Sequence, residues 1–175
     1  MQREVSGGAG EILFHDKFWL PDEIKAGIEA LVPVAGRNNM IETESLFIID
    51  DCYNANPVST KASLDVLKMA DSRKVAILGD MFELGENENA LHATVGEHAA
   101  KIGIDVLVCI GGLSENTKKG ALAVDSAYNV HHFATKADFL AVASELIQKN
   151  DTILVKASHG MAFTELVEYL QNMKF

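Results

Sequence analysis

The residues with the clearest chemical potential follow a short apolar run near the start of the chain. Asp50 and Asp51 end this run, and Tyr53, Asn54 and Asn56 stand within the next five residues. A carboxylate at the carboxyl end of a strand can accept hydrogen bonds from ribose hydroxyls, as acidic residues do in dinucleotide-binding folds. Asp51 is therefore the first candidate for a nucleotide contact, and the alternative is a carboxylate that caps a turn.

Each residue near Asp51 is a candidate either for binding a ligand or for a local structural role. Asp50 faces the opposite side of a strand, so both interpretations stay open for it. Asn56 is more typical of a helix N-cap than of a ligand contact, because Pro57 suits the first position of a helix. Asn54 has no evident local role, which favours binding, and Tyr53 can offer its hydroxyl at the rim of a site.

Polar residues also follow two later apolar runs. Asp80 and Glu83 come after the run that ends near residue 78, and they can bind an ammonium group or hold the shape of a loop. Lys156 ends the last apolar run, with Ser158 and His159 directly behind it, and its ammonium group can bind a carboxylate or a phosphate.

The first part of the chain does not fit the pattern of the rest. Residues 21–31 form one amphipathic pattern with a proline and acids at its start, which predicts a helix. Arg37 stands at the junction with the following region, where a guanidinium can clamp phosphate or stack on a base. A solvated surface arginine is the alternative. We expect residues 1–35 to be a short helical appendage, either the end of a preceding domain or an added segment.

From residue 39 onward, strand and helix patterns alternate. Short apolar runs predict strands, and longer runs with apolar residues three and four apart predict helices. The strands are expected at 39–43, 45–49, 74–78, 106–110, 130–133 and 152–156, and the helices at 57–69, 88–102, 114–124, 136–148 and 161–171.

This alternation predicts an α/β domain over residues 36–175. Strands joined by helices form a doubly wound, mostly parallel, Rossmann-like sheet with helices on both faces, and the first two strands add an antiparallel edge. Binding sites in such sheets lie at the carboxyl ends of the strands. We therefore expect Asp51 and Lys156 to lie close together on one rim.

Composition narrows the classes of partner. The 175 residues carry a formal net charge of −10, which opposes binding to nucleic acid but permits a small anionic ligand in a local positive pocket. No apolar run approaches the ~20 residues that span a bilayer, and no signal-peptide pattern opens the chain, so we expect no membrane contact and a cytoplasmic location. Cys52 and Cys109 are expected to be reduced, and no metal-binding spacing or phosphate-binding loop occurs.

Three segments together carry a resemblance to a known family. Residues 50–57 are similar to the D-D-x-Y-N-A-N-P segment of the Mur ligases that add D-alanyl-D-alanine to UDP-N-acetylmuramoyl-tripeptide. Residues 78–86, with the downstream His92, are similar to their L-G-D-M-x-E-L-G-E segment, and residues 155–161 are similar to their V-K-G-S-R-x-M segment. The likeness extends over roughly residues 33–170 and keeps the order of the segments.

The resemblance implies the carboxyl-terminal domain of an ATP-dependent amide ligase in peptidoglycan synthesis. It implies that ATP and Mg are held mainly by a preceding central domain, that UDP-N-acetylmuramoyl-tripeptide is held by other domains, and that this chain is inactive alone. It also implies two sets of contacts and no catalytic or metal-binding residue in the chain itself. The nucleotide contacts are Arg37, Asp51 and Asn54, and the substrate contacts, which include D-alanyl-D-alanine, are Tyr53, Asn56, Asp80, Glu83, Lys156, Ser158 and His159.

The last segment departs from the family pattern. Ala157 stands at the usual glycine, His159 stands at the usual arginine, and the usual glutamate falls at Thr164 with Glu165 displaced by one. If that arginine holds the carboxylate of the dipeptide, this chain must hold it in another way.

Three other classes of protein remain as alternatives. A receiver-type signalling domain is disfavoured because residues 109–112, Cys-Ile-Gly-Gly, lack a phosphoacceptor aspartate after the middle strand. A non-catalytic nucleotide- or peptide-binding Rossmann-like module shares the fold. A Mur-type ligase for another amino acid is disfavoured by the Y-N-A-N-P spelling.

Overall fold

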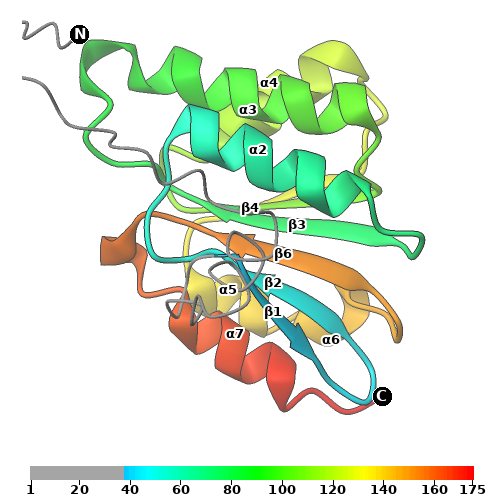
Figure 1. Cartoon of the computed structure of the whole chain (residues 1–175). Coiled ribbons are helices and arrows are strands. Elements are labelled where there is room, and N and C mark those ends of the chain that lie inside the picture. The colour runs from blue at the N-terminus through cyan, green and yellow to red at the C-terminus, as the bar shows by residue number, and fades with distance from the viewer. Residues whose placement is uncertain (1–37) are drawn as a thin grey trace, which may run out of the picture. The chain divides into compact units, whose positions relative to one another are not determined.

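The computed structural model describes residues 38–175 (Figure 1). The helix expected at 21–31 and the junction arginine Arg37 lie outside the described residues. The description below concerns the compact unit that spans Pro33–Phe175, within those bounds.

One six-stranded sheet organises this unit. Its order is β1-β2-β6-β3-β4-β5, and only the β1–β2 pair is antiparallel. The last strand of the chain therefore lies in the middle of the sheet. The strands are β1 (Asn39–Glu42), β2 (Phe47–Asp50), β3 (Lys74–Gly79), β4 (Val106–Ile110), β5 (Val130–Phe133) and β6 (Thr152–Lys156).

Helices cover both faces of the sheet (Figure 1). Leu64, Val95 and Ala121 pack from three helices onto one face, while Phe139 and Leu166 pack onto the other. The first layer holds α2 (Pro57–Lys68), α3 (Glu88–Ile102) and α4 (Glu115–Val124), and the second holds α5 (Lys136–Leu140), α6 (Ala143–Leu146) and α7 (Thr164–Gln171). The predicted doubly wound α/β fold with an antiparallel edge strand is confirmed.

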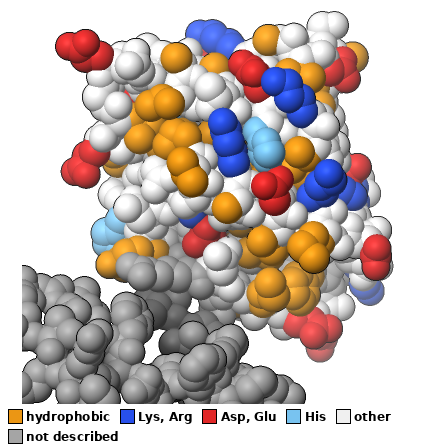
Figure 2. Space-filling model, turned by 45° about the horizontal axis from the view of Figure 1, so that its top comes forward, with side chains coloured by type: hydrophobic (Ala, Val, Ile, Leu, Met, Phe, Trp, Pro, Cys, Tyr) orange, Lys and Arg blue, Asp and Glu red, His pale blue; other side chains and the backbone are white. Residues whose placement is uncertain are grey.

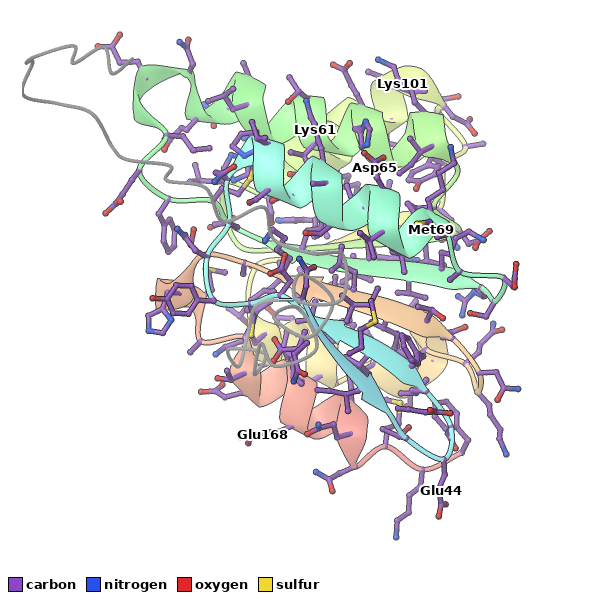
Figure 3. All side chains as sticks on the ribbon, in the orientation of Figure 1. Glu44, Lys61, Asp65, Met69, Lys101 and Glu168 are labelled. Carbon is purple, nitrogen blue, oxygen red and sulfur yellow. The ribbon has the colours of Figure 1, made fainter. Side chains whose placement is uncertain are left out.

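The outer surface of the first helical layer is charged and polar. Lys61 and Asp65 stand one turn apart on α2, and Met69 follows at its C-cap (Figure 3). Asp65 pairs with His98 of α3 at 2.8 Å. Acidic, basic and hydrophobic side chains are interspersed on the face shown in Figure 2, so no single sign of charge dominates it. Within residues 38–175, no helix has the length and apolar character needed to cross a membrane.

The prediction of one continuous helix at 136–148 is wrong. The chain forms α5, leaves helical geometry at Val142, and forms the short α6. The carbonyl of Leu146 accepts a hydrogen bond from Arg73 at 3.0 Å, and the backbone N–H of Gln148 donates to Asp151 at 2.8 Å. These contacts stabilise a non-helical end, so the segment stops two residues early.

The predicted helix at 161–171 begins later than expected. A 3₁₀ turn, η2 (His159–Met161), precedes it, and Ala162 has a φ of +50°. A left-handed residue cannot continue a right-handed helix, so α7 starts only at Thr164.

Candidate functional site

The carboxyl ends of three adjacent strands form the rim where the candidate residues meet. β6 pairs in parallel with β2 on one side and with β3 on the other. Asp51 directly follows β2, Asp80 directly follows β3, and Lys156 is the last residue of β6. The helices that follow β2 and β3 lie in one layer and the helix that follows β6 lies in the other, so the connections diverge at this rim, as they do at the switch points where open α/β sheets bind ligands.

Asp51 and Lys156 form a buried ion pair at the centre of this rim. Lys156 Nζ lies 2.5 Å from Asp51 Oδ2, and the two side chains are 2% and 10% exposed. Ser63 Oγ of α2 donates to the same carboxylate oxygen at 2.6 Å, and the backbone N–H of Asn38 donates to Oδ1 at 3.2 Å. The expected proximity of Asp51 and Lys156 is therefore present.

The ammonium group of Lys156 also shapes the loop that follows β2. It donates to the backbone carbonyl of Asn54 at 3.0 Å. A buried charge is stable only when it is paired and hydrogen-bonded, and Lys156 meets this condition through the protein itself. In this conformation Lys156 positions residues 51–54, and its side chain is almost fully buried.

Asp50 points away from this pair, as its place in the strand predicts. Its Oδ1 accepts from the backbone N–H of Cys52 at 3.3 Å and from Cys52 Sγ at 2.7 Å. Burial, together with the hydrogen bond and charge of Asp50, raises the pKa of Cys52 to about 12. Burial also raises the pKa of Cys109 well above its ordinary value.

Asn56 caps the helix that begins beside the site. Its side chain accepts from the backbone N–H of Ser59 at 2.9 Å, and Ser59 Oγ accepts in return from the backbone N–H of Asn56 at 3.2 Å. Pro57 occupies the first helical position. The expected capping role of Asn56 is confirmed, and the helix N-terminus directs its partial positive charge toward the rim.

A hollow of about 380 Å³ opens beside the ion pair and the start of α2. Asp51 and Asn54, which were predicted to contact nucleotide, both line it. Its volume falls within the range of small-molecule sites. The lining residues are Asn38, Asp51, Tyr53, Asn54, Asn56, Ser59, Ala62, Ser63, Val66 and Lys156. We call this hollow the α2 pocket.

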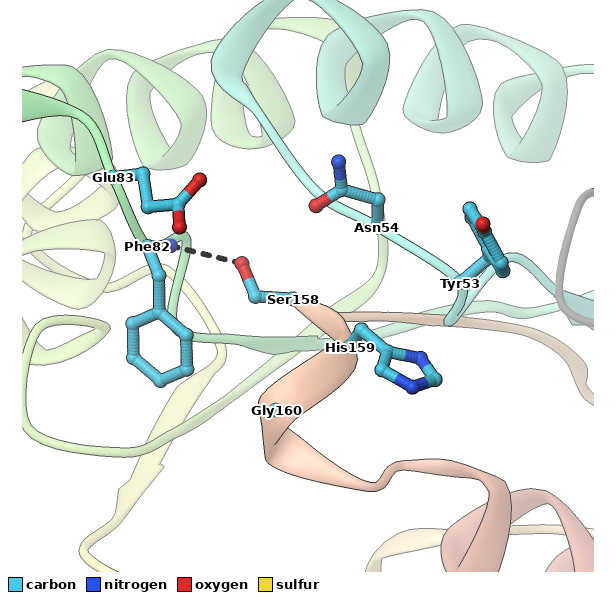
Figure 4. A pocket seen from close by; sticks show the side chains of 7 residues that line it. All are labelled: Tyr53, Asn54, Phe82, Glu83, Ser158, His159 and Gly160. Atoms are coloured by element: carbon cyan, nitrogen blue, oxygen red, sulfur yellow. Dashed lines mark hydrogen bonds between the residues drawn. The ribbon is translucent and has the colours of Figure 1, made fainter.

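A second hollow of about 340 Å³ lies on the other side of Tyr53 and Asn54, which line both (Figure 4). Its other walls come from the loops after β3 and β6. The rings of Tyr53 and His159 are 5.9 Å apart between centroids. The lining residues are Tyr53, Asn54, Phe82, Glu83, Ser158, His159 and Gly160. We call this hollow the β3–β6 pocket.

Asp80 lines neither pocket but holds the loops around them. Its Oδ1 accepts from the backbone N–H of Ser114 at 2.7 Å, and its carbonyl accepts from the backbone N–H of Ser158 at 3.0 Å. Gly111 has a φ of +118°, and a Cβ there would lie 2.5 Å from the Asp80 carboxylate. Only glycine allows this close approach, so Asp80 connects the loops after β3, β4 and β6.

His92 supports the β3 loop from α3. It is fully buried, its Nε2 accepts from the backbone N–H of Met81 at 2.9 Å, and its Nδ1 lies 2.7 Å from the carbonyl of Glu88. Both bonds form when the neutral ring carries its proton on Nδ1. His92 therefore serves the structure of the β3 loop.

Several pocket residues were not anticipated from the sequence. Ser59 and Ser63 line the α2 pocket, and Phe82 and Gly160 line the β3–β6 pocket. The two serines follow Asn56 at helical spacing, which places them on one face of α2 and is a signal that could have found them. Phe82 and Gly160 carried no such signal, because they enter through loop conformation alone.

Within residues 38–175, no three His, Cys, Asp or Glu side chains gather in a way that could hold a metal ion. Two of the acidic residues at the rim are already engaged, since Asp51 pairs with Lys156 and Asp80 accepts from Ser114. The described residues therefore do not fit a magnesium site of their own.

Comparison with known proteins identifies the family of this fold and rim. Residues 36–159 match the family described as Mur ligase, glutamate ligase domain. The chain belongs to the Mur ligase family. This Mur ligase domain includes every described candidate site residue, from Asp51 to His159.

Two relatives of this Mur ligase domain carry the same name. The chain is 35% identical over 153 residues to the UDP-N-acetylmuramoyl-tripeptide--D-alanyl-D-alanine ligase of Bacillus subtilis, covering 86% of this chain and 34% of that protein. It is 38% identical over 154 residues to the ligase of the same name from Escherichia coli, covering 86% and 32%. The chain thus spans about a third of the length of these relatives.

Solved structures agree with the sequence relatives. A crystal structure of MurF from Acinetobacter baumannii superposes with a TM-score of 0.78 at 29% identity, covering 87% of this chain and 34% of that one. A MurF ligase from Thermotoga maritima in complex with ADP superposes with a TM-score of 0.66 at 26% identity, covering 81% and 32%. The predicted resemblance to the carboxyl-terminal domain of this ligase is confirmed.

Proposed function

We propose that this chain is the carboxyl-terminal domain of an ATP-dependent ligase that adds D-alanyl-D-alanine to UDP-N-acetylmuramoyl-tripeptide. In that reaction ATP phosphorylates the tripeptide carboxylate, the dipeptide amine attacks the acyl phosphate, and phosphate leaves. The domain contributes by closing over the nucleotide and by positioning the dipeptide, which lowers the entropic part of the barrier.

The observation that carries this proposal is the α2 pocket, with Asp51 and Asn54 beside a helix N-terminus. We assign the nucleotide ribose to the Asp51 carboxylate, whose Oδ1 accepts only one long hydrogen bond among residues 38–175. The ADP complex of the Thermotoga maritima ligase supports a nucleotide site in proteins of this shape. In this proposal the preceding domain binds the ATP phosphates and Mg. The expected cytoplasmic location remains a prediction.

The assignment can be tested by titrating the isotopically labelled chain with ADP and following backbone amide resonances. We expect shifts at residues 51–63, and we expect Asp51→Asn to weaken ADP binding by about tenfold, because the amide presents a weaker acceptor to the ribose. Asp71→Asn is the matched control, since Asp71 is an exposed acid just before β3, at the other end of the strands.

Asn is chosen at residue 51 because it retains an acceptor for Lys156 and Ser63, and thermal unfolding of each variant checks the fold. Equal ADP affinity in Asp51→Asn and the parent, or shifts confined to other loops, would contradict the nucleotide assignment.

A further inference from the structure

The α2 pocket contains one side chain to which the family resemblance assigns no role, the hydroxyl of Ser63. Ser63 is 3% exposed, and it lines the hollow from the second turn of α2. Its Oγ donates to Asp51 Oδ2 at 2.6 Å. A hydrogen bond to a carboxylate is charge-assisted and is stronger than one between neutral groups. Ser63 therefore acts directly on the residue to which the ribose is assigned.

The Ser63 hydroxyl has a second acceptor within reach in its own helix. Ser63 Oγ lies 2.8 Å from the carbonyl of Ser59, one turn earlier in α2. Serines in helices commonly bond to a carbonyl of the preceding turn. A hydroxyl carries a single proton, so it cannot donate fully to both acceptors. The bond to the charged oxygen is the shorter of the two, which makes the Asp51 carboxylate the favoured acceptor.

Two donors from different elements converge on the same oxygen of Asp51. Lys156 Nζ, at the end of the central strand β6, lies 2.5 Å from Oδ2, and Ser63 approaches the same atom from α2. The other oxygen, Oδ1, accepts from the backbone N–H of Asn38 at 3.2 Å. Because a carboxylate oxygen accepts roughly two strong hydrogen bonds, the two donors fill Oδ2 and leave Oδ1 as the oxygen with room for a ligand hydroxyl.

The position of Ser63 is fixed by a helix rather than by a loop. Asn56 and Ser59 form the capping box at the start of α2, and Pro57 occupies its first position. Leu64, the next residue after Ser63, is fully buried in the core. Groups on helices and strands hold a site more precisely than groups on loops. Ser63 can therefore hold the Asp51 carboxylate in one orientation before a ligand arrives.

We infer that Ser63 is a positioning residue that gives the α2 pocket its preference for ribose hydroxyls. Together with Lys156 it fixes the orientation of Asp51, so that Oδ1 meets the sugar without turning on binding. The inference rests on the proposed function, which supplies the nucleotide, and it adds the origin of selectivity for a ribose. A site that pairs with a substrate hydroxyl disfavours an analogue that lacks it, because the group in the site is left without its partner.

A comparison of two nucleotides measures this preference in the isotopically labelled chain. ADP and 2′,3′-dideoxy-ADP differ only in the ribose hydroxyls, so the ratio of their dissociation constants reports the hydroxyl contact. Following the amide resonances of residues 51–63, we expect the parent chain to bind ADP about tenfold more tightly than the dideoxy analogue. We expect Ser63→Ala to reduce this ratio to about threefold or less, because the Asp51 carboxylate loses one of the donors that orient it.

Further serine variants separate this positioning role from a role in the fold. Ser63→Thr retains a hydroxyl on α2 and is expected to restore the ratio toward that of the parent. Ser144→Ala is the matched control, since Ser144 is an exposed serine in α6, in the other helical layer. Alanine is a better helix former than serine, so we expect little loss of thermal midpoint in Ser63→Ala, and thermal unfolding of each variant checks this.

The outcomes distinguish this inference from the nucleotide assignment. The same ratio in Ser63→Ala as in the parent would overturn the inference. Equal weakening of ADP and dideoxy-ADP in Ser63→Ala would also overturn it, because a residue that only shapes the pocket affects both nucleotides alike. In either case, ADP binding by the parent leaves the nucleotide assignment intact. If millimolar ADP shifts no resonance of residues 51–63 in the parent, the proposed nucleotide site is itself wrong, and the inference fails with it.

Discussion

At the scale of single residues, burial decides which charged groups are available to a ligand. Lys156 is 2% exposed and bonded to Asp51 and to the loop carbonyl of Asn54. Glu83 and His159 are exposed and face a hollow. Removing one partner of a buried ion pair typically costs about 3–5 kcal/mol of stability, because the other charge is left uncompensated. Because both residues of the Lys156–Asp51 pair also line the α2 pocket, the pair contributes to the stability of the chain and to the site.

The two cysteines give a prediction on pH and reactivity. Cys52 is 4% exposed and Cys109 is fully buried, and burial is the main cause of the raised pKa of each thiol. The thiolate is the reactive form, so we expect neither thiol to react with a water-soluble disulfide reagent at pH 8 in the folded chain. In guanidinium chloride both are expected to react, and absorbance counts the thiols.

The same pKa shift fixes the sign of the pH dependence of stability. The pKa of Cys52 rises from 9.0 to about 12 on folding. Between these values the unfolded chain binds fewer protons than the folded chain, so the contribution of Cys52 to stability falls as pH rises from about 9 toward 12. Rapid labelling of one thiol in the native chain at pH 8 would contradict this account of Cys52 and Cys109.

At the scale of elements, two glycines set the approach of α3 to α4. A Cβ at Gly96 would lie 1.8 Å from the carbonyl oxygen of Thr117, and a Cβ at Gly120 would lie 2.0 Å from that of Ala93. The two helices thus touch backbone to backbone. No side chain larger than hydrogen fits at either position without moving a helix.

This contact predicts that Gly96→Ala destabilises the chain. Alanine normally stabilises a helix interior by about 1 kcal/mol relative to glycine. Here overpacking, which typically costs about 1–3 kcal/mol, is expected to outweigh that gain. Urea unfolding measures the net change. The control is Gly112→Ala, where a Cβ meets nothing within 4 Å, and a stabilised Gly96→Ala variant would refute the close helix contact.

Sequence patterns predicted most elements because their periodicity is strong. The strands at 106–110, 130–133 and 152–156 and the helix at 88–102 match their predicted bounds, since apolar runs and helical stripes define them. The early end of this helical segment at Leu146 was not predictable, because Arg73 and Asp151 contact residues 146–148 only in the folded chain.

The candidate site was likewise predictable only in part. The parallel sheet made the meeting of Asp51 and Lys156 predictable, since strand ends share a rim. The burial of Lys156 and the left-handed φ of Glu83 were not predictable, because both arise from loop packing. Arg37, predicted to reach the nucleotide, lies outside the described residues and stays a prediction.

At the scale of the whole molecule, the two pockets are open surfaces that share the wall formed by Tyr53 and Asn54. No phosphate-binding loop occurs in the 175 residues, and the chain spans about a third of its relatives. In the proposed function, the rest of the nucleotide site comes from residues beyond this rim.

We accordingly expect no ligase activity from this chain by itself. With ATP, Mg, D-alanyl-D-alanine and UDP-N-acetylmuramoyl-tripeptide all present, ADP release should stay at the background rate of a sample without protein. A coupled assay for ADP measures this, and a full-length relative such as the Escherichia coli ligase is the positive control. ADP release above background that requires the dipeptide would show that the chain holds a complete active site.

The position of β6 has a consequence for how the chain must fold during synthesis. The strand at the middle of the sheet is the last one made, and Lys156 is 105 residues from its partner Asp51. Until it emerges from the ribosome, the nascent β1–β2 hairpin and the β3–β4–β5 group each present an open edge to other chains. Both pockets include residues of β6 or of the loop after it, so they form only when β6 takes its place between β2 and β3.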